Sequence, residues 1–178
     1  MRMLRTMSCV TLSFAIGLTA SVGAQAEPRD HETVSVGPWT IATTYKADKF
    51  DNCTMSRSAG DLGITFVRAE DGLSLVVDSP KWKLERGKAY PIRLIAGAHA
   101  LEAKALAETR SVTVALADRP FNARLRSSSV LQVQGEGATL RLPLDRSSAA
   151  LERLDVCFEK NSHDAVATNP FVARTRSP

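Results

Sequence analysis

Alternation of apolar and polar residues constrains the fold of this chain more than any other feature. In residues 37–45, Trp39, Ile41 and Tyr45 share one face of an extended segment. Successive side chains of a β-strand point to opposite faces, so such a run predicts a half-buried strand. Similar runs lie at residues 63–79, 111–116 and 130–144. With the glycine turns "EDG" and "GEG" inside these runs, the pattern predicts a mainly β chain. We expect an antiparallel β-sandwich or barrel-like domain with one or two short C-terminal helices.

Two segments have a helical pattern instead. Residues 118–126 offer Asp118 as an N-cap and Pro120 in the first turn, which predicts a short helix. Residues 145–160 predict a longer helix, with Ser147 or Ser148 as its cap. Its inward stripe would consist of Ala150, Leu151, Leu154, Cys157 and Phe158.

One segment is open between two structures. Residues 98–110 are rich in helix formers, yet residues 93–106 also fit two strands joined by a turn at Gly97. We favour the strand. Pro143 falls on the outward register of its run, a position that suits an edge strand or a strand end.

The N-terminus predicts a secretory signal peptide over residues 1–26. Arg2 and Arg5 precede an apolar, uncharged run at 9–24, and "AQA" at 24–26 has the small residues of a cleavage site. The run is short for a membrane anchor, so we expect a periplasmic or secreted protein and not an integral membrane protein. The remaining chain divides into a flexible N-terminus at 27–34, a single β-rich domain at 35–160 and a flexible C-terminal tail at 161–178.

The cysteines fit that compartment. Cys9 would leave with the leader, and an even pair in a secreted chain predicts a disulfide between Cys53 and Cys157. The chain has no CxxC motif and no histidine close in sequence to either cysteine, and zinc would need more ligands at tighter spacing. A free or catalytic thiol that uses a distant histidine stays open as the alternative.

Charge and motifs argue against several functions. The leader holds two arginines and no acid, which leaves 21 basic and 19 acidic residues and a net charge of +2. That charge does not suggest nucleic-acid binding. The sequence has no nucleophile elbow, zinc-protease motif, phosphate loop or calcium loop. We therefore expect no cofactor and no enzymatic activity.

The candidate binding segment is residues 81–93. It carries Lys81, Lys83, Arg86 and Lys88 around Trp82, with Glu85 as its only acid. On a strand, Trp82 would point to one face and both neighbouring lysines to the other. The functional interpretation is a basic patch for an anionic surface or an acidic protein. The alternatives are a core tryptophan with a solvated outer face, or lysines that protect a sheet edge from aggregation.

Two stretches resemble the invasion-associated locus B family of secreted bacterial proteins. These are "VGPWTIATTYKADKFDNCTMSRS" at 36–58 and "FNARLRSSSVLQVQGEGATLRLPLDRSSAALERL" at 121–154. The chain departs from that family in having no cysteine between Cys53 and Cys157, and in "SSS" at 127–129 where a glycine is usual. The resemblance implies a periplasmic β-rich domain linked to envelope or host interaction, and it supplies no catalytic residues.

The sequence thus predicts a secreted or periplasmic, non-catalytic interaction domain of the bacterial envelope. Its partner would be an envelope or host protein, or an anionic surface. The alternative is a small β-barrel that binds an apolar ligand. A ligand-binding barrel requires an open interior, whereas an interaction domain has a filled core.

Overall fold

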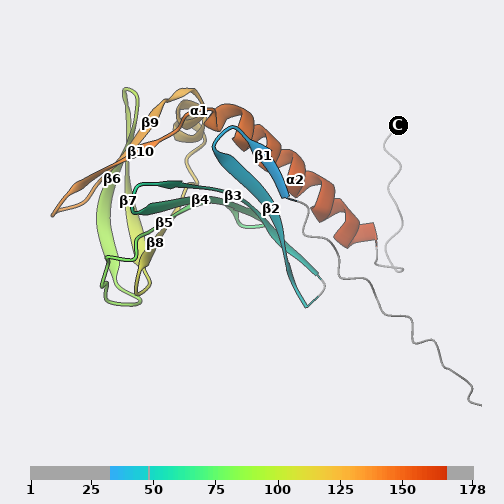
Figure 1. The fold of residues 1–178 in the computed structure, drawn as a ribbon, viewed down its shortest axis with the longest axis horizontal. Helices are drawn as coiled ribbons and strands as arrows, with labels where there is room; N and C mark the ends of the chain where they lie inside the picture. The colour runs from blue at the N-terminus through green and yellow to red at the C-terminus, as the bar shows by residue number, and fades with distance from the viewer. Residues whose placement is uncertain (1–32, 48, 168–178) are drawn as a thin grey trace, which may run out of the picture. The chain divides into compact units, whose positions relative to one another are not determined.

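A computed structural model describes residues 33–47 and 49–167 of the chain. They form one sheet of ten antiparallel strands and two helices (Figure 1). In chain order the elements are β1 Thr33–Val36, β2 Trp39–Lys46, β3 Lys49–Ala59, β4 Leu62–Ala69, β5 Gly72–Asp78, β6 Ala89–Ala96, β7 His99–Ala107, β8 Ser111–Ala115, α1 Arg119–Ser127, β9 Val130–Gln134, β10 Thr139–Pro143 and α2 Ser147–Ala167. The predicted fold class, a mainly antiparallel β chain with one or two C-terminal helices, is confirmed, but α2 has 21 residues and is longer than the short helix expected.

The sheet is open. The strands lie in the order β1-β2-β3-β4-β5-β8-β7-β6-β9-β10, with β1 and β10 at its two ends. Each strand from β1 to β5 pairs with the next one along the chain in a hairpin. The chain then crosses to β6, which pairs with β7, and β8 returns to pair with β5. The predicted positions of three features are confirmed: the turn at Gly72, the strand over most of 98–110, and Pro143 at the end of an edge strand.

Inward-facing side chains fill the core between the sheet and the helices. The largest fully buried ones come from both halves of the sheet and from α1 and α2: Trp39, Met55, Ile64, Phe66, Leu75, Leu94, Leu125, Leu131, Leu142 and Leu151. The Trp39 ring is tilted by 57° to the Phe66 ring, with ring centres 5.9 Å apart, and its Nε1–H donates to the Asp145 carbonyl at 2.8 Å. The polar edge of the largest core side chain is thereby satisfied without water.

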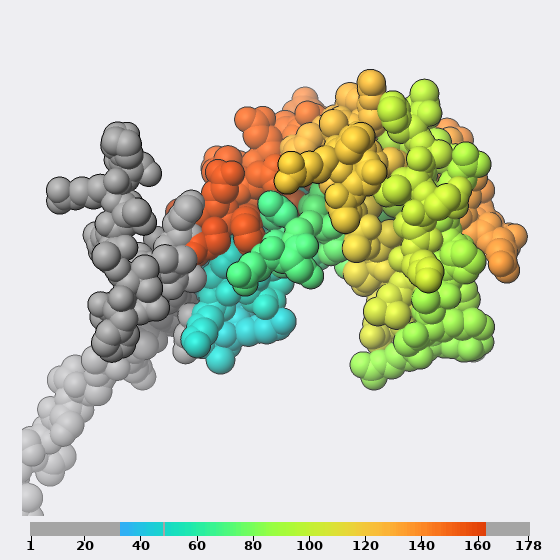
Figure 2. Space-filling view, turned by 180° about the vertical axis from the view of Figure 1, so that it is seen from behind, coloured from blue at the N-terminus to red at the C-terminus, as the bar shows by residue number. Residues whose placement is uncertain are grey.

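The two helices cover the inward face of the sheet. α2 packs along β2, β3 and β4, and α1 lies between α2 and the β6–β7 hairpin (Figure 2). Asp118 caps α1 as predicted, since its Oδ1 accepts from the Phe121 amide at 2.6 Å. The cap predicted at Ser147 is wrong, because the Ser147 Oγ is buried with no hydrogen-bond partner. The chain instead enters α2 through Arg146, which has a φ of 57°.

The ordered elements extend past both predicted limits of the domain. β1 begins at Thr33 because it pairs with β2, and α2 continues to Ala167 because no glycine or proline interrupts residues 161–167. The predicted signal peptide at 1–26 lies outside the described residues. Within the described part of the chain, neither helix has the length and apolar character needed to cross a bilayer.

Candidate functional site

The segment predicted to be a basic strand is an irregular loop. Residues 79–88 connect β5 to β6, and β6 starts only at Ala89. Pro80 and Gly87 interrupt the extended pattern, and the backbone finds its partners elsewhere. The Trp82 amide donates to the Ser79 carbonyl at 3.2 Å in a tight turn, and the Leu84 amide donates to the Thr109 carbonyl at 3.0 Å. The loop is therefore held against the β7–β8 connection rather than paired as a strand.

Three of the four predicted cations are paired with acids. Lys81 contacts Asp61, Arg86 Nε lies 2.7 Å from Glu108, and Lys88 Nζ lies 3.1 Å from Glu85. No carboxylate of the described residues lies within 4.0 Å of Lys83. These side chains are exposed, so each pair contributes little to stability. They do offset most of the positive charge that the sequence places in this loop.

The pKa of Lys88 is raised by its neighbours. Its Nζ donates a hydrogen bond to Glu85, and the negative charge of Glu85 adds to that effect, so the pKa of Lys88 lies above its ordinary value. The same ammonium group lies 5.3 Å from the centre of the Tyr90 ring. Lys88 therefore joins the loop to the aromatic side chain at the start of β6.

Trp82, in the same loop, lines an apolar groove. The groove has a volume of about 390 Å³. Its apolar wall combines residues of the loop with inward-facing residues of five strands, β6 to β10, and we call it the Trp82 groove. Among the side chains that line it are Trp82, Leu84, Tyr90, Ile92, Ala105, Val112, Val133 and Leu140. The turn at 135–138 closes one side. The groove is thus the place where the apolar inward face of the sheet reaches the surface.

The Trp82 groove is nearly uncharged. Glu136, in the β9–β10 turn, is the one charged residue among those that line it. Trp82 and Tyr90 are half-buried, so each presents an aromatic surface to solvent. Loop 79–88 is tied down by backbone hydrogen bonds, among them Gly87 N–H to the Ala107 carbonyl at 2.7 Å. The groove is consequently preformed, and its lining suits the binding of an apolar group rather than catalysis.

Cys53 and Cys157 are at disulfide distance, with Cα atoms 6.2 Å apart. This agrees with the predicted pair, since bonded cysteines usually have Cα atoms about 4.4–6.8 Å apart. Cys53 is fully buried in β3, and Cys157 lies on the inward stripe of α2, as the sequence indicated. The pair joins the C-terminal helix to the middle of the sheet, next to Thr43.

The described part of the chain contains no group of three or more His, Cys, Asp and Glu residues that could hold a metal ion. The candidate site is therefore the Trp82 groove. The sequence identified Trp82 but missed the other walls, because Tyr90, Val112 and Leu140 are ordinary inward positions on three different strands.

Comparisons with protein-family models, with curated proteins and with solved structures found no match to this chain.

Proposed function

We propose that this chain is a non-catalytic interaction domain of the bacterial envelope, secreted or periplasmic, and that it receives apolar side chains of a partner protein in the Trp82 groove. The observation that carries the proposal is the groove itself, an open apolar surface built on a filled core. In the residues that the structure describes, the buried apolar side chains form one core cluster, whereas a ligand-binding barrel requires an open interior. The resemblance to the invasion-associated locus B family points to the same class of protein.

The chemistry of the groove defines the partner. Trp and Tyr are enriched among the residues that dominate binding energy at protein interfaces, because they bury a large rigid surface at little entropic cost. Trp82 and Tyr90 both lie in the groove with their rings partly exposed. The surrounding cations are offset by Asp61, Glu85 and Glu108, so an anionic surface is a weaker candidate than an apolar one.

A second candidate function is the binding of a small apolar ligand in the same groove. Its volume of about 390 Å³ falls within the range of about 300–1,000 Å³ that is usual for small-molecule sites. The ligand would lie at the surface of an open sheet, not inside a closed barrel. Displacement of the dye anilinonaphthalene sulfonate by decanoate, in the native protein but not in Trp82→Ala, would favour this candidate over a protein partner.

Site-specific photo-crosslinking in the producing cell tests the main proposal. A benzoylphenylalanine at position 84 places the crosslinker inside the groove, and the same residue at position 106 is the matched control. Leu106 is 52% exposed and points to the opposite face of the sheet, because its neighbours Ala105 and Ala107 are buried. We expect a discrete adduct from position 84 that is lost in Trp82→Asp, and none from position 106. Equal adducts from both positions, or none from either, would contradict the proposal.

The compartment is tested separately. N-terminal sequencing of the protein from a periplasmic or culture fraction should begin at Glu27, after removal of residues 1–26. Recovery of the intact chain from the cytoplasmic fraction alone would contradict the proposed location without bearing on the groove.

A further inference from the structure

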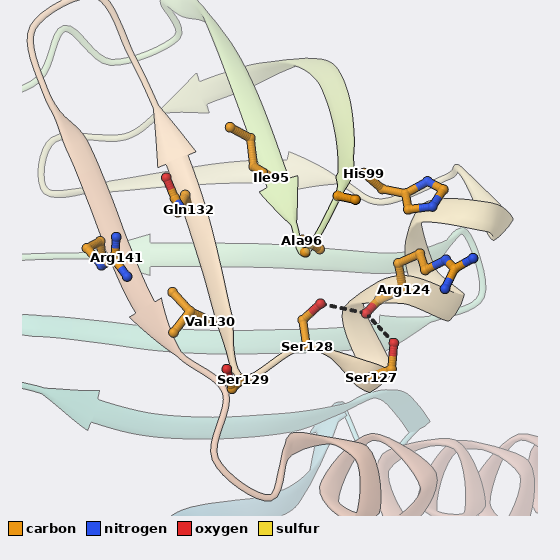
Figure 3. A pocket seen from close by; sticks show the side chains of 12 residues that line it. Ile95, Ala96, His99, Arg124, Ser127, Ser128, Ser129, Val130, Gln132 and Arg141 are labelled. Atoms are coloured by element: carbon orange, nitrogen blue, oxygen red, sulfur yellow. Dashed lines mark hydrogen bonds between the residues drawn. The ribbon is translucent and has the colours of Figure 1, made fainter.

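A second cavity, of about 540 Å³, lies where the end of α1 meets the β6–β7 turn and the β9–β10 hairpin. We call it the arginine cavity; its polar lining includes His99, Arg124, Ser128, Ser129, Gln132 and Arg141. Arg124 and His99 lie on one side of it and Arg141 and Gln132 on the opposite side (Figure 3). A Cβ on Gly97 would lie 3.6 Å from the Ser128 Oγ, so the β6–β7 turn and the helix end form one wall.

Charge distinguishes this cavity from its neighbours. Two arginines and no carboxylate line it. Among the residues that the structure describes, no carboxylate oxygen lies within 4.0 Å of either Arg124 or Arg141. A cavity of similar size beside α2 has balanced charges instead: Arg68, Arg119 and Arg126 against Asp71, Asp155 and Glu159. The arginine cavity therefore has a positive charge that the protein does not offset.

The end of α1 would ordinarily oppose an anion, because the last carbonyls of a helix carry partial negative charge. Here two of them, those of Arg124 and Leu125, accept hydrogen bonds. The hydroxyls of Ser127 and Ser128 both donate to the Arg124 carbonyl, at 3.1 and 2.8 Å (Figure 3). The Ser128 amide donates to the Leu125 carbonyl at 3.2 Å. These bonds reduce the negative potential that the helix end presents to the cavity.

The placement of the arginines defines the shape of the ligand. A guanidinium group recognises a carboxylate or phosphate through two parallel hydrogen bonds. Arg124 and Arg141 lie on opposite sides of the cavity (Figure 3). A single small oxyanion between them would therefore bind one guanidinium group well and the other poorly. Ser129 and Gln132 also line the cavity, and their side chains offer hydrogen bonds to an uncharged polar body.

We propose that the arginine cavity binds a small organic molecule with an oxyanion group at each end, one held by Arg124 and the other by Arg141. This site is independent of the Trp82 groove and shares none of its lining residues.

Calorimetric titration at low ionic strength tests the proposal with a graded set of probes. Fructose 1,6-bisphosphate carries an anionic group at each end, fructose 6-phosphate at one end, and fructose at neither; adipate supplies a dicarboxylate. We expect the bisphosphate to bind about tenfold more tightly than the monophosphate, which is the effect of one exposed charge-assisted contact. Adipate that binds with the same dependence on the arginines would show that carboxylates serve as well as phosphates.

The variants locate the site. Arg124→Gln and Arg141→Gln should each lower the affinity for the bisphosphate about tenfold and leave it close to that of the monophosphate. Arg119→Gln is the matched control, since Arg119 is an exposed arginine of the same helix that does not line the cavity. Ser129→Asp keeps both arginines, adds a carboxylate to the wall and should also weaken binding. The proposal is overturned if neither fructose 1,6-bisphosphate nor adipate binds more tightly than fructose 6-phosphate, or if Arg119→Gln lowers the affinity as much as the two cavity variants.

Discussion

Breaking the Cys53–Cys157 bond should lower the stability of the domain without detaching α2. The helix has further anchors, because Ala150, Leu151 and Leu154 are buried at 0–1% exposure on its inward stripe. Those contacts form in the native state whether or not the sulfurs are joined. The bond therefore acts mainly on the unfolded chain, by restricting the conformations that it can reach.

The magnitude follows from the length of chain that the bond closes. Cys53 and Cys157 are 104 residues apart, and a loop of that length corresponds to about 4–5 kcal/mol in the chain-entropy model. For a domain of this size, 1 kcal/mol shifts the melting temperature by about 2–4 °C, so the loss of the bond should lower it by roughly 10–20 °C.

Scanning calorimetry on four samples measures this effect. The samples are the oxidised protein, the same protein with a phosphine reductant, the variant Cys53→Ala/Cys157→Ala, and that variant with the reductant. We expect the last three to melt together, well below the first, and all four to share one far-ultraviolet dichroism spectrum at 25 °C. A thiol count of two in the unfolded, unreduced protein would refute the bond. A reduced protein that melts with the oxidised one would refute the entropic reasoning.

Three further predictions concern single contacts. Trp39→Phe removes the buried donor to the Asp145 carbonyl and should destabilise the fold by about 1–3 kcal/mol in chemical unfolding, whereas an unchanged midpoint would mean that water replaces the donor. Asp118→Ala removes the cap of α1 and should lower the free energy of unfolding by about 1 kcal/mol in the same measurement. Asp118→Asn, which keeps a capping oxygen, should retain most of that stability. A nuclear magnetic resonance titration should find the pKa of Lys88 raised in the native protein and lower in Glu85→Gln, because the hydrogen bond and the charge of Glu85 are the largest causes of the shift. Because the folded-state pKa is raised, this pair stabilises the fold below pH 10.5 and loses its effect as the pH rises through the folded-state pKa of Lys88.

The strands and helices were largely predictable because their signals are local. Alternating residues such as Ile64 and Phe66 in β4, or Leu75 and Val77 in β5, report directly which side chains face the core. The same holds for Asp118, whose capping interaction spans only three residues. Features that depend only on residues close together in the sequence can therefore be predicted from it.

The loop at 79–88 was not predictable in this way. Lys-Trp-Lys has the alternation of a strand, but the hydrogen bonds that decide its shape come from Ala107 and Thr109, some 20 residues away. The pairing of β5 with β8 brings those partners close, and no pattern in the loop itself reports that pairing.

The two cavities were hidden for the same reason. Arg124 and Arg141 each look like an ordinary outward cation, one on a helix and one on an edge strand. Only the pairing of β6 with β9 and of β9 with β10 brings Arg141 to the same cavity as the end of α1. The single local hint was the serine run at 127–129, whose first two hydroxyls bond the last turn of α1.

Binding of the purified protein to envelope fractions from the cells that produce it tests the central claim most directly. The native protein should bind saturably, Trp82→Ala should bind at least about tenfold more weakly, and Leu106→Ala should bind within about twofold of the native protein. Both residues are apolar and partly exposed, but only Trp82 lines the groove. Equal binding by Trp82→Ala and the native protein, or no saturable binding by the native protein, would contradict the account.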